Sequence, residues 1–369
     1  MPTSIPLSNT PIDSVAIKKI LDQYEGISHE TIIADFEIKL CEFTKATYAI
    51  ALSSGTAAIH LALKAVGVGS NDEVIVSTFT YVATINPILY LGARPIFVDV
   101  EEQSWNMDPE LLEIAIKDRI NNGLKPKAIL VVHTYGMPAR MEDIMNISKK
   151  FEIPVVEDAA EALGSGIGGK SVGTFGKIGI VSFNNNKILT TYGGGAILTE
   201  DAGVAEKILF WAGQSRESKM YYEHKELGYN YRMGPINAAV GLSKIDRLES
   251  EISQRRGCFE VYNKALGIPG FHFQIEIPGH FSNRWLSTVC LRNKSELEAI
   301  SKMLFDQGIE TRRVWKPMHQ QPVFKDSPFY GSAVSEELFS TGLCLPSGSN
   351  LLPADLERIV TLIKQQFLM

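Results

Sequence analysis

One lysine stands apart from the other charged residues of the sequence. Lys187 lies in the stretch SFNNNKILTTYGGGAILTED, among amide and small side chains, and the nearest acid downstream is Glu200. A lysine on a solvated helix face has acidic and basic neighbours instead. Two interpretations are open: an ordinary loop charge, or a lysine enclosed by a pocket. Uncharged company favours a nucleophilic amine, because an adjacent acid would keep the amine as an ammonium that cannot attack an aldehyde.

Three other polar or aromatic groups also follow predicted strands. Asp158 comes just after the strand-like stretch PVVE, the string Ser53-Ser54-Gly55-Thr56 opens a helix, and Tyr81 stands just beyond a further strand. In an open parallel sheet, ligands bind outside the carboxyl ends of the strands. These groups can therefore converge with Lys187. Each group also has an ordinary interpretation. Asp158 and Lys187 can be a buried ion pair or unrelated loop residues. The SSGT string can be a simple helix cap, and Tyr81 can be a core residue.

Taken together, these groups suggest pyridoxal phosphate chemistry. A helix N-terminus offers free N–H groups to a phosphate, and a lysine amine forms a Schiff base with an aldehyde. A carboxylate keeps a pyridine nitrogen protonated, so that the ring can take up carbanion electrons. The glycines 193–195 would bring backbone close to such a site without a side chain in the way.

A second glycine motif points elsewhere. Residues 164–169, GSGIGG, fit the pattern G-x-G-x-x-G. A dinucleotide-binding turn needs a helix that opens at the motif, but the following KSVGTFGKIG is too rich in glycine and β-branched residues for one. We expect a turn-rich hairpin here and no nicotinamide dehydrogenase.

Short apolar strands alternate with helices over the first two-thirds of the chain. This pattern predicts an α/β fold with a mostly parallel sheet covered on both faces. We expect a large domain at 1–250 and a smaller C-terminal α+β domain at 251–369. The predicted strands are 48–52, 73–76, 95–98, 128–133, 154–156, 178–183, 196–198, 287–291 and 342–345. The predicted helices are 15–24, 33–43, 55–66, 82–90, a helix capped by Asp108, 142–151, 296–307 and 354–367, and a helix-rich stretch at 235–266 reads as a spacer between the domains.

Composition excludes several classes of function. The chain has 369 residues, 45% hydrophobic, with a net charge of −6 and no long run of Lys or Arg. We therefore expect no nucleic-acid or membrane-surface partner, and no transmembrane helix because no apolar run approaches 18 residues. The four cysteines form no C-x-x-C pair, which indicates reduced thiols in a cytoplasmic protein. We expect no metal site.

Several stretches, in order along nearly the whole chain, resemble the DegT/DnrJ/EryC1/StrS aminotransferases. They are SSGTAAIHLAL, FTYVATINPILYLGARPIFVDV, EDAAEALGS, SFNNNKILTTYGGGAIL and GYNYRM. The resemblance implies a fold-type I pyridoxal phosphate enzyme that aminates keto-sugar nucleotides. L-Glutamate would be the amino donor, 2-oxoglutarate its product, and pyridoxamine phosphate the intermediate form of the cofactor.

The resemblance also implies roles for individual residues. Lys187 resembles the Schiff-base lysine and Asp158 the partner of the pyridinium. Glu161 stands near the cofactor's phenolic oxygen, where the family often has Gln or His, and this is a departure from the commonest pattern. The remaining cofactor contacts implied are stacking by Tyr81, phosphate binding by backbone N–H groups of Gly55 and Thr56 and by the Ser182 hydroxyl, and a contact from Asn230 to the phosphate of a neighbouring subunit. A homodimer with a shared active site would follow.

Two stretches, SNRWLST and ETRRVWKPMH, look closest to the branch that makes UDP-4-amino sugars for N-acetylbacillosamine. Guanidinium groups bind phosphate oxygens in a bidentate manner, and the substrate contacts implied are Asn283, Arg284, Arg312 and His319. Ordinary surface arginines are the alternative. Two other functions stay open: amination of a 3-keto or differently linked nucleotide sugar, and a catalytically inactive dimeric binding or regulatory protein.

Overall fold

The computed structural model describes residues 4–8, 10 and 13–368. Its largest sheet has eight strands in the order β1-β9-β8-β5-β4-β2-β3-β14. All of them run parallel except β9, which is antiparallel to both of its neighbours, so the predicted mostly parallel sheet is confirmed. The strands of this sheet are β1 (Tyr48–Leu52), β2 (Glu73–Ser77), β3 (Arg94–Val98), β4 (Ala128–Val132), β5 (Val155–Asp158), β8 (Ile178–Ser182), β9 (Gly195–Thr199) and β14 (Phe329–Tyr330).

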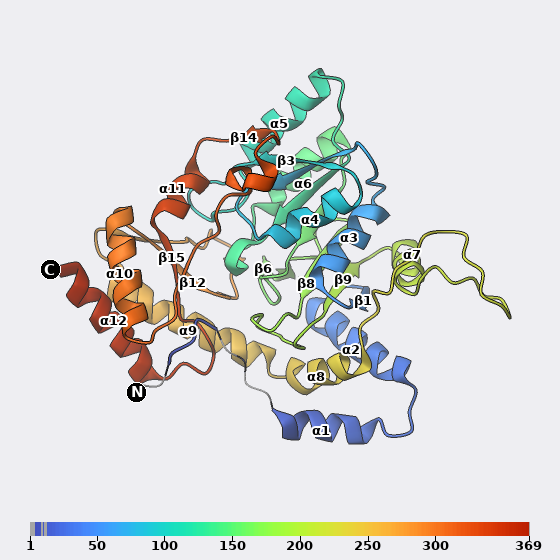
Figure 1. Ribbon diagram of the computed structural model, residues 1–369, viewed down its shortest axis with the longest axis horizontal. Helices are drawn as coiled ribbons and strands as arrows, with labels where there is room; N and C mark the ends of the chain where they lie inside the picture. The colour runs from blue at the N-terminus through green and yellow to red at the C-terminus, as the bar shows by residue number, and fades with distance from the viewer. Residues whose placement is uncertain (1–3, 9, 11–12, 369) are drawn as a thin grey trace.

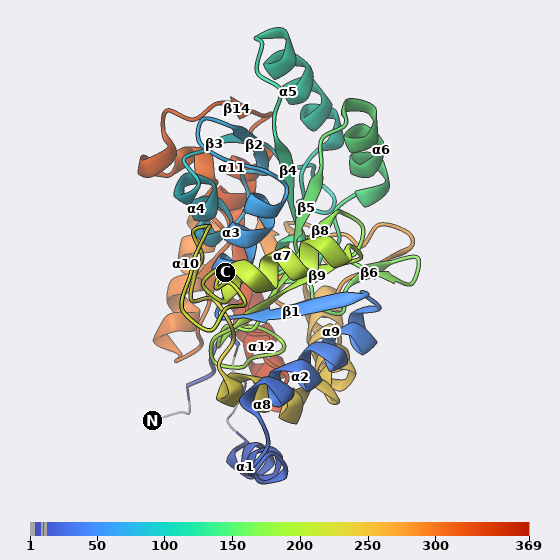
Figure 2. The same ribbon diagram turned by 90° about the vertical axis from the view of Figure 1, so that its right-hand side faces the viewer.

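Helices cover both faces of this sheet (Figures 1 and 2). In β2, Val74 and Val76 pack in one hydrophobic cluster and Ile75 in another, because alternate side chains of a strand point to opposite faces. One face packs against α3, α4 and α7, and the other against α5 and α6, with α2 and α8 near β1. These helices are α2 (His29–Thr44), α3 (Gly55–Ala65), α4 (Val82–Tyr90), α5 (Pro109–Asn121), α6 (Met141–Phe151), α7 (Ala202–Ala212) and α8 (Pro235–Ile245).

A smaller α+β unit follows. Its four-stranded antiparallel sheet has the order β10-β12-β15-β13 and packs against α9, α10 and α12. Its elements are α9 (Leu248–Leu266), β10 (Phe271–Phe273), β12 (Ser287–Leu291), α10 (Lys294–Asp306), β13 (Arg312–Arg313), α11 (Val334–Thr341), β15 (Gly342–Leu345) and α12 (Pro353–Leu368). The other helices are α1 (Ser14–Gln23) and the 3-10 turns Thr134–Gly136, Met318–Gln320 and Pro322–Phe324.

Two segments cross the division expected at residue 250. Near the N-terminus, Ile5 forms a bridge with Ile309 and packs in the core of the smaller unit. Near the C-terminus, β14 pairs with β3 at the edge of the large sheet. Helix α9 begins at Leu248, so the expected division falls inside it. The smaller unit is therefore connected to the large one by several segments of the chain.

The GSGIGG motif forms the hairpin that the sequence indicates. Strands β6 (Gly166–Ile167) and β7 (Lys170–Ser171) pair in antiparallel fashion, and β11 (His280–Phe281) extends them to a three-stranded sheet. Gly168 and Gly169 form the turn, with φ of 58° and 84°, a left-handed conformation that favours glycine.

Three further predictions can be compared with the structure. The Asp108 carboxylate accepts hydrogen bonds from the first backbone N–H groups of α5, as predicted for its cap. All four cysteines are free thiols. Within the part of the chain that the structure describes, no helix combines the length and apolar character needed to cross a membrane.

Candidate active site

A cavity of about 370 Å³ opens at the carboxyl ends of the strands of the large sheet. Seven of the residues predicted to bind a cofactor or to react line it together: Gly55, Thr56, Tyr81, Asp158, Glu161, Ser182 and Lys187. Each follows or ends a strand: β1 leads to the start of α3, β2 to the start of α4, and β5 and β8 to the acids and the lysine. The predicted convergence of strand ends is what brings these residues to one place.

Lys187 does not lie in uncharged company, contrary to our expectation. Its Nζ lies 3.6 Å from Glu161 Oε1 and 4.0 Å from the centroid of the Trp285 ring, and its side chain is 13% exposed. The sequence neighbours of the lysine are indeed uncharged. However, the loop after β5 brings a carboxylate from a distant part of the chain to the amine. The amine is therefore held by an acid and an aromatic face.

Asp158 is buried at the end of β5. Its Oδ2 accepts a hydrogen bond of 2.8 Å from Thr84 Oγ1, and its Oδ1 accepts one of 3.1 Å from the N–H of Ala160. Burial raises the pKa of Asp158, and the hydrogen bond from Thr84 opposes that rise. The Thr84 hydroxyl uses its one O–H to donate a hydrogen bond to Asp158. Thr80 Oγ1 must therefore be the donor in the 2.7 Å contact between the two threonines.

Glu161 is the second buried acid of the cavity. Burial raises its pKa, and the Lys187 charge and the backbone N–H of Tyr135 counteract the rise. Its Oε2 accepts the Tyr135 N–H at 2.7 Å, which leaves Oε1 facing the lysine. A carboxyl in this setting can exchange a proton with a neighbouring amine or phenolate oxygen.

The far end of the cavity has the features of a phosphate site. The Ser54 hydroxyl caps α3 by accepting the N–H of Ala57, and the first N–H groups of a helix have no partner within the helix. A Cβ on Gly55 would lie 3.0 Å from the Ser182 Cβ, and a Cβ on Gly195 would lie 2.5 Å from the Gly55 N. These two glycines therefore let the start of α3 pack closely against β8 and β9. This cradle at the start of α3, the buried Asp158 and the lysine fit pyridoxal phosphate.

Aromatic rings form the outer wall. Tyr81 is 53% exposed and lies 5.2 Å from Trp315, measured between ring centroids. Tyr135 stacks between Trp315 and Trp285, at 5.7 and 6.3 Å. Sequence reasoning missed both tryptophans as site residues. They lie in SNRWLST and ETRRVWKPMH. In these stretches the arginines were chosen as candidate site residues, because guanidinium groups bind phosphate oxygens.

None of the four predicted substrate contacts lines this cavity, and three of them, Asn283, Arg284 and His319, are held in packed surroundings. The buried Asn283 donates from Nδ2 to the backbone oxygens of Glu161 and Leu163, at 3.0 and 2.9 Å. The Arg284 guanidinium is buried 3.6 Å over the Phe259 ring, where burial lowers its pKa to about 10. His319 contacts the Thr78 hydroxyl through Nδ1 at 2.7 Å and stacks on a phenylalanine. The substrate roles of these three residues remain predictions.

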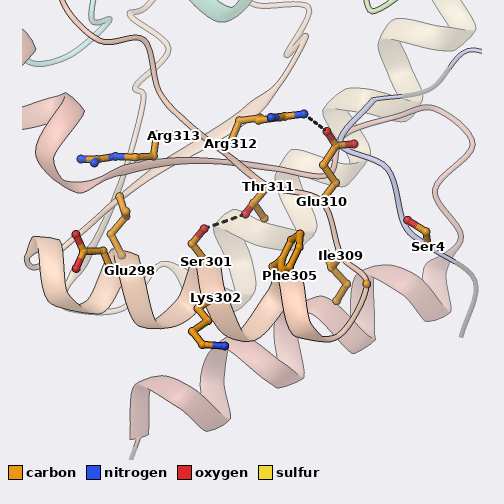
Figure 3. Close-up of a pocket in the computed structure, with 12 residues that line it drawn as sticks. Ser4, Glu298, Ser301, Lys302, Phe305, Ile309, Glu310, Thr311, Arg312 and Arg313 are labelled. Carbon is orange, nitrogen blue, oxygen red and sulfur yellow. Dashed lines mark hydrogen bonds and ion pairs between the residues drawn. The ribbon is translucent and has the colours of Figure 1, made fainter. Parts of the chain in front are cut away.

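Arg312 lies beside the lysine cavity. It lines a second cavity of about 470 Å³, which shares Asn186, Trp285 and Trp315 with the first. Its guanidinium forms an ion pair with Glu310 at 2.8 Å (Figure 3). Figure 3 also shows that Arg312 and the helix α10 border a separate surface hollow, which contains none of the residues around the lysine.

Asn230 lies away from the cavity of its own chain. Its backbone pairs with Gly213 where a projecting arm, residues 214–229, leaves the body of the protein (Figure 1). Within the described residues, no three side chains of the His, Cys, Asp and Glu types stand together as a metal site would require.

Comparison with known proteins agrees with this geometry. The chain is 43% identical over 91% of its length to EpsN of Bacillus subtilis (strain 168), named as a candidate pyridoxal phosphate-dependent aminotransferase, and covers 88% of that protein. It is 38% identical to a GDP-perosamine synthase of Escherichia coli O157:H7, with 91% of this chain and 90% of the relative covered. A DegT DnrJ EryC1 StrS aminotransferase from Brucella abortus superposes with a TM-score of 0.89, at 32% identity, over 95% of this chain and 94% of the other.

The family model for the DegT/DnrJ/EryC1/StrS aminotransferases matches residues 13–364. This match spans both units of the fold, and the solved relative confirms the expected fold-type I architecture. The cavity, the cradle and the sequence matches lead to one conclusion. The chain belongs to the DegT/DnrJ/EryC1/StrS aminotransferase family and is a transaminase with pyridoxal phosphate as its cofactor.

Proposed function

We propose that this transaminase moves the amino group of L-glutamate to the 4-keto carbon of a UDP-linked 2-acetamido-2,6-dideoxy sugar. The products are 2-oxoglutarate and a 4-amino sugar nucleotide of the kind from which N-acetylbacillosamine is made. The observation that carries the proposal is the meeting of Lys187, Asp158 and Glu161 in one cavity beside a helix N-terminus. The family match supports the transfer of an amino group to a nucleotide sugar.

The residues of the cavity divide the work of the reaction. When bound, pyridoxal phosphate supplies a carbonyl carbon for the amines and a ring that takes up electrons. Asp158 holds a proton at the ring nitrogen, which requires the carboxylate to be ionised despite its burial. The helix N-terminus at Gly55 and Thr56 and the Ser182 hydroxyl hold the phosphate. In the first half of the reaction, Lys187 would take the proton from the α-carbon of glutamate. In the second half, it would give a proton to the sugar carbon that receives the amino group.

Glu161 has a distinct task in this scheme. Its Oε1 lies 3.6 Å from the lysine Nζ, an ion-pair distance, so the charge on each group affects the charge on the other. A proton on Glu161 frees the amine as a base, and it also removes the repulsion between the carboxylate and a phenolate oxygen. The family often has Gln or His at this position, and a protonated Glu resembles both as a hydrogen-bond donor.

The second cavity gives the sugar nucleotide a path out of the lysine cavity. The second cavity begins at the shared residues Trp285 and Trp315 and extends to Arg312, which offers a guanidinium to a diphosphate. We therefore assign the keto group of the substrate to the lysine cavity and the diphosphate to the vicinity of Arg312.

A homodimer completes the proposal. The arm of residues 214–229 projects from the body of the protein and carries the exposed apolar side chains Met220, Tyr221, Tyr222 and Leu227 (Figure 1). Apolar side chains gathered on a projection favour burial against another protein surface. If a second copy covers the arm, Asn230 at its base can contact the phosphate bound by that copy.

One spectrum tests the amino transfer. The visible absorption of the purified protein is recorded before and after L-glutamate is added. Loss of the band of the lysine-bound cofactor, together with release of 2-oxoglutarate, is expected. A protein that stays colourless after pyridoxal phosphate is added would contradict the proposed transamination. It would favour the alternative of a catalytically inactive binding or regulatory protein.

A panel of keto sugars then tests the acceptor. The glutamate-treated protein is offered UDP- and GDP-linked 4-keto sugars and a 3-keto sugar, and the products are identified by NMR. The 4-amino UDP sugar is expected. The relative named for GDP-perosamine favours a GDP-linked acceptor as the second candidate, and a faster reaction with that sugar would replace the UDP assignment.

A further inference from the structure

The segment Ser282–Trp285 forms a tightly built turn against the loop that carries Glu161. The Asn283 amide donates to the backbone oxygens of Glu161 and Leu163, and its Oδ1 accepts the N–H of Trp285 at 2.9 Å. Arg284 has a left-handed φ of 50°, which is uncommon for a residue with a side chain. Its buried guanidinium over Phe259 anchors that conformation. The turn therefore sets the position of the next residue.

Gly136 shows how closely this turn is packed. A Cβ at Gly136 would overlap the Asn283 amide, so this part of the wall admits only glycine. The residue that the turn delivers is Trp285, which is 2% exposed and stacks nearly parallel to Tyr135, with 16° between the ring planes. A side chain fixed from both sides offers a rigid surface to the cavity.

Trp285 contacts the reacting lysine in two ways. The face of its ring lies 4.0 Å from Lys187 Nζ, within the range of a cation–π interaction. Its indole Nε1 donates to the backbone oxygen of Asn186 at 2.8 Å, and Asn186 is the residue before the lysine. One contact holds the end of the lysine side chain and the other holds the backbone from which that side chain starts.

We infer that Trp285 is a positioning residue for Lys187: its ring face and its indole N–H together hold the amine beside Glu161. The smaller unit of the fold thus fixes a group that belongs to the large one. Its importance for catalysis rests on the proposed function, because only there does Lys187 react. The contact itself exists in the cofactor-free protein and can be measured without any substrate.

The test is the rate at which Lys187 is acylated in cofactor-free protein, followed by peptide mass spectrometry. The exposed Lys45 serves as an internal reference. Loss of the ring in Trp285→Leu should accelerate acylation of Lys187 by about two- to thirty-fold, the range of a cation–π contact. Trp285→Phe retains an aromatic face and should stay closer to the wild type. Trp315→Leu is the matched control, because Trp315 lines the same cavity but lies over Tyr135 and Tyr81.

Two outcomes would overturn the inference. One is an unchanged rate in Trp285→Leu, and the other is an equal acceleration in Trp315→Leu, which would mean that opening the cavity matters rather than the contact. If Trp285→Leu does not fold, fluorinated tryptophan can replace all four tryptophans of the chain. Fluorine weakens the negative face of the ring at nearly constant shape, so acylation of Lys187 should rise with the number of fluorines, and a constant rate would refute the contact.

Turnover separates positioning from a merely structural role. In Trp285→Leu, kcat should fall more than KM for L-glutamate rises, because the ring contacts the amine rather than the donor. Trp285→Phe should restore only part of kcat, because it keeps the aromatic face but lacks the N–H that donates to the backbone oxygen of Asn186. A change confined to KM would reject the positioning role. If acylation changes as expected but no variant or wild-type protein turns over, the contact is confirmed and the proposed function is what fails.

Discussion

Replacing Thr84 by valine should shift the pH dependence of cofactor binding. The Thr84 hydroxyl donates to the buried Asp158 carboxylate at 2.8 Å, and valine removes that hydrogen bond at nearly constant shape. A hydrogen bond to a charged group contributes about 1.5–3 kcal/mol. At about 1.4 kcal/mol per pKa unit, its loss should raise the pKa of Asp158 by about one to two units.

The sign follows from which form the bond stabilises. The hydrogen bond favours the ionised carboxylate, and burial already raises the pKa of Asp158. Without the bond, Asp158 takes up its proton at a higher pH. Cofactor binding needs the ionised carboxylate. As the pH is lowered, binding to the variant should therefore weaken at a pH one to two units higher than in the wild type. Binding at alkaline pH should change little.

The assay is the dissociation constant of pyridoxal phosphate, measured by absorbance titration across the acid and neutral range. Thr84→Ser retains the hydroxyl and should keep the acid limb near its wild-type position. Thr80→Val removes only the outer bond of the chain, from Thr80 to Thr84, and should move the limb less than Thr84→Val. If folded Thr84→Val keeps the wild-type acid limb, or if Thr84→Ser shifts equally far, the reasoning is wrong.

Three further predictions concern the amine, the phosphate cradle and the subunit contact. Lys187→Ala should still bind the cofactor but lose turnover, and near-normal turnover with glutamate and keto sugar would contradict the scheme. Gly195→Ala should weaken phosphate binding and lower the melting temperature, because its Cβ would meet the Gly55 N at 2.5 Å; Gly257→Ala in α9, whose Cβ would find open space away from the cavity, should bind phosphate like the wild type without a lower melting temperature. Asn230→Ala should weaken cofactor binding by about ten- to a hundredfold, and mixing this variant with Lys187→Ala should restore activity through mixed dimers, whereas two independent sites would show no recovery.

Local sequence patterns determined much of the fold. The strands β1 and β12 have the bounds that their apolar runs predict, and α5 begins after its predicted cap, Asp108. Short uniformly apolar runs between helices suffice to predict a parallel sheet, since such strands are buried on both faces. The convergence of Lys187 and Asp158 followed in turn, because parallel strands end at the same edge.

Side-chain direction could not be predicted in the same way. SNRWLST and ETRRVWKPMH were singled out for Asn283, Arg284, Arg312 and His319. In the structure, Arg284 and His319 point into packed surroundings, while Trp285 and Trp315 line the cavity. The residue types and spacing within these two stretches do not indicate which of their side chains face the cavity. The left-handed turn at Arg284 and its packing against the loop after β5 decide which side chain faces the site.

The sequence by itself determined the family, the strands and the groups that can react. Only the tertiary structure decided what surrounds the reacting amine. Lys187 has uncharged neighbours along the chain, yet in the folded protein Glu161 and Trp285 contact it from two other segments. The physical reason is that the electrostatic environment of a buried group depends on distance in space, and the order of strands in the sheet brings remote loops to within a few ångströms of each other.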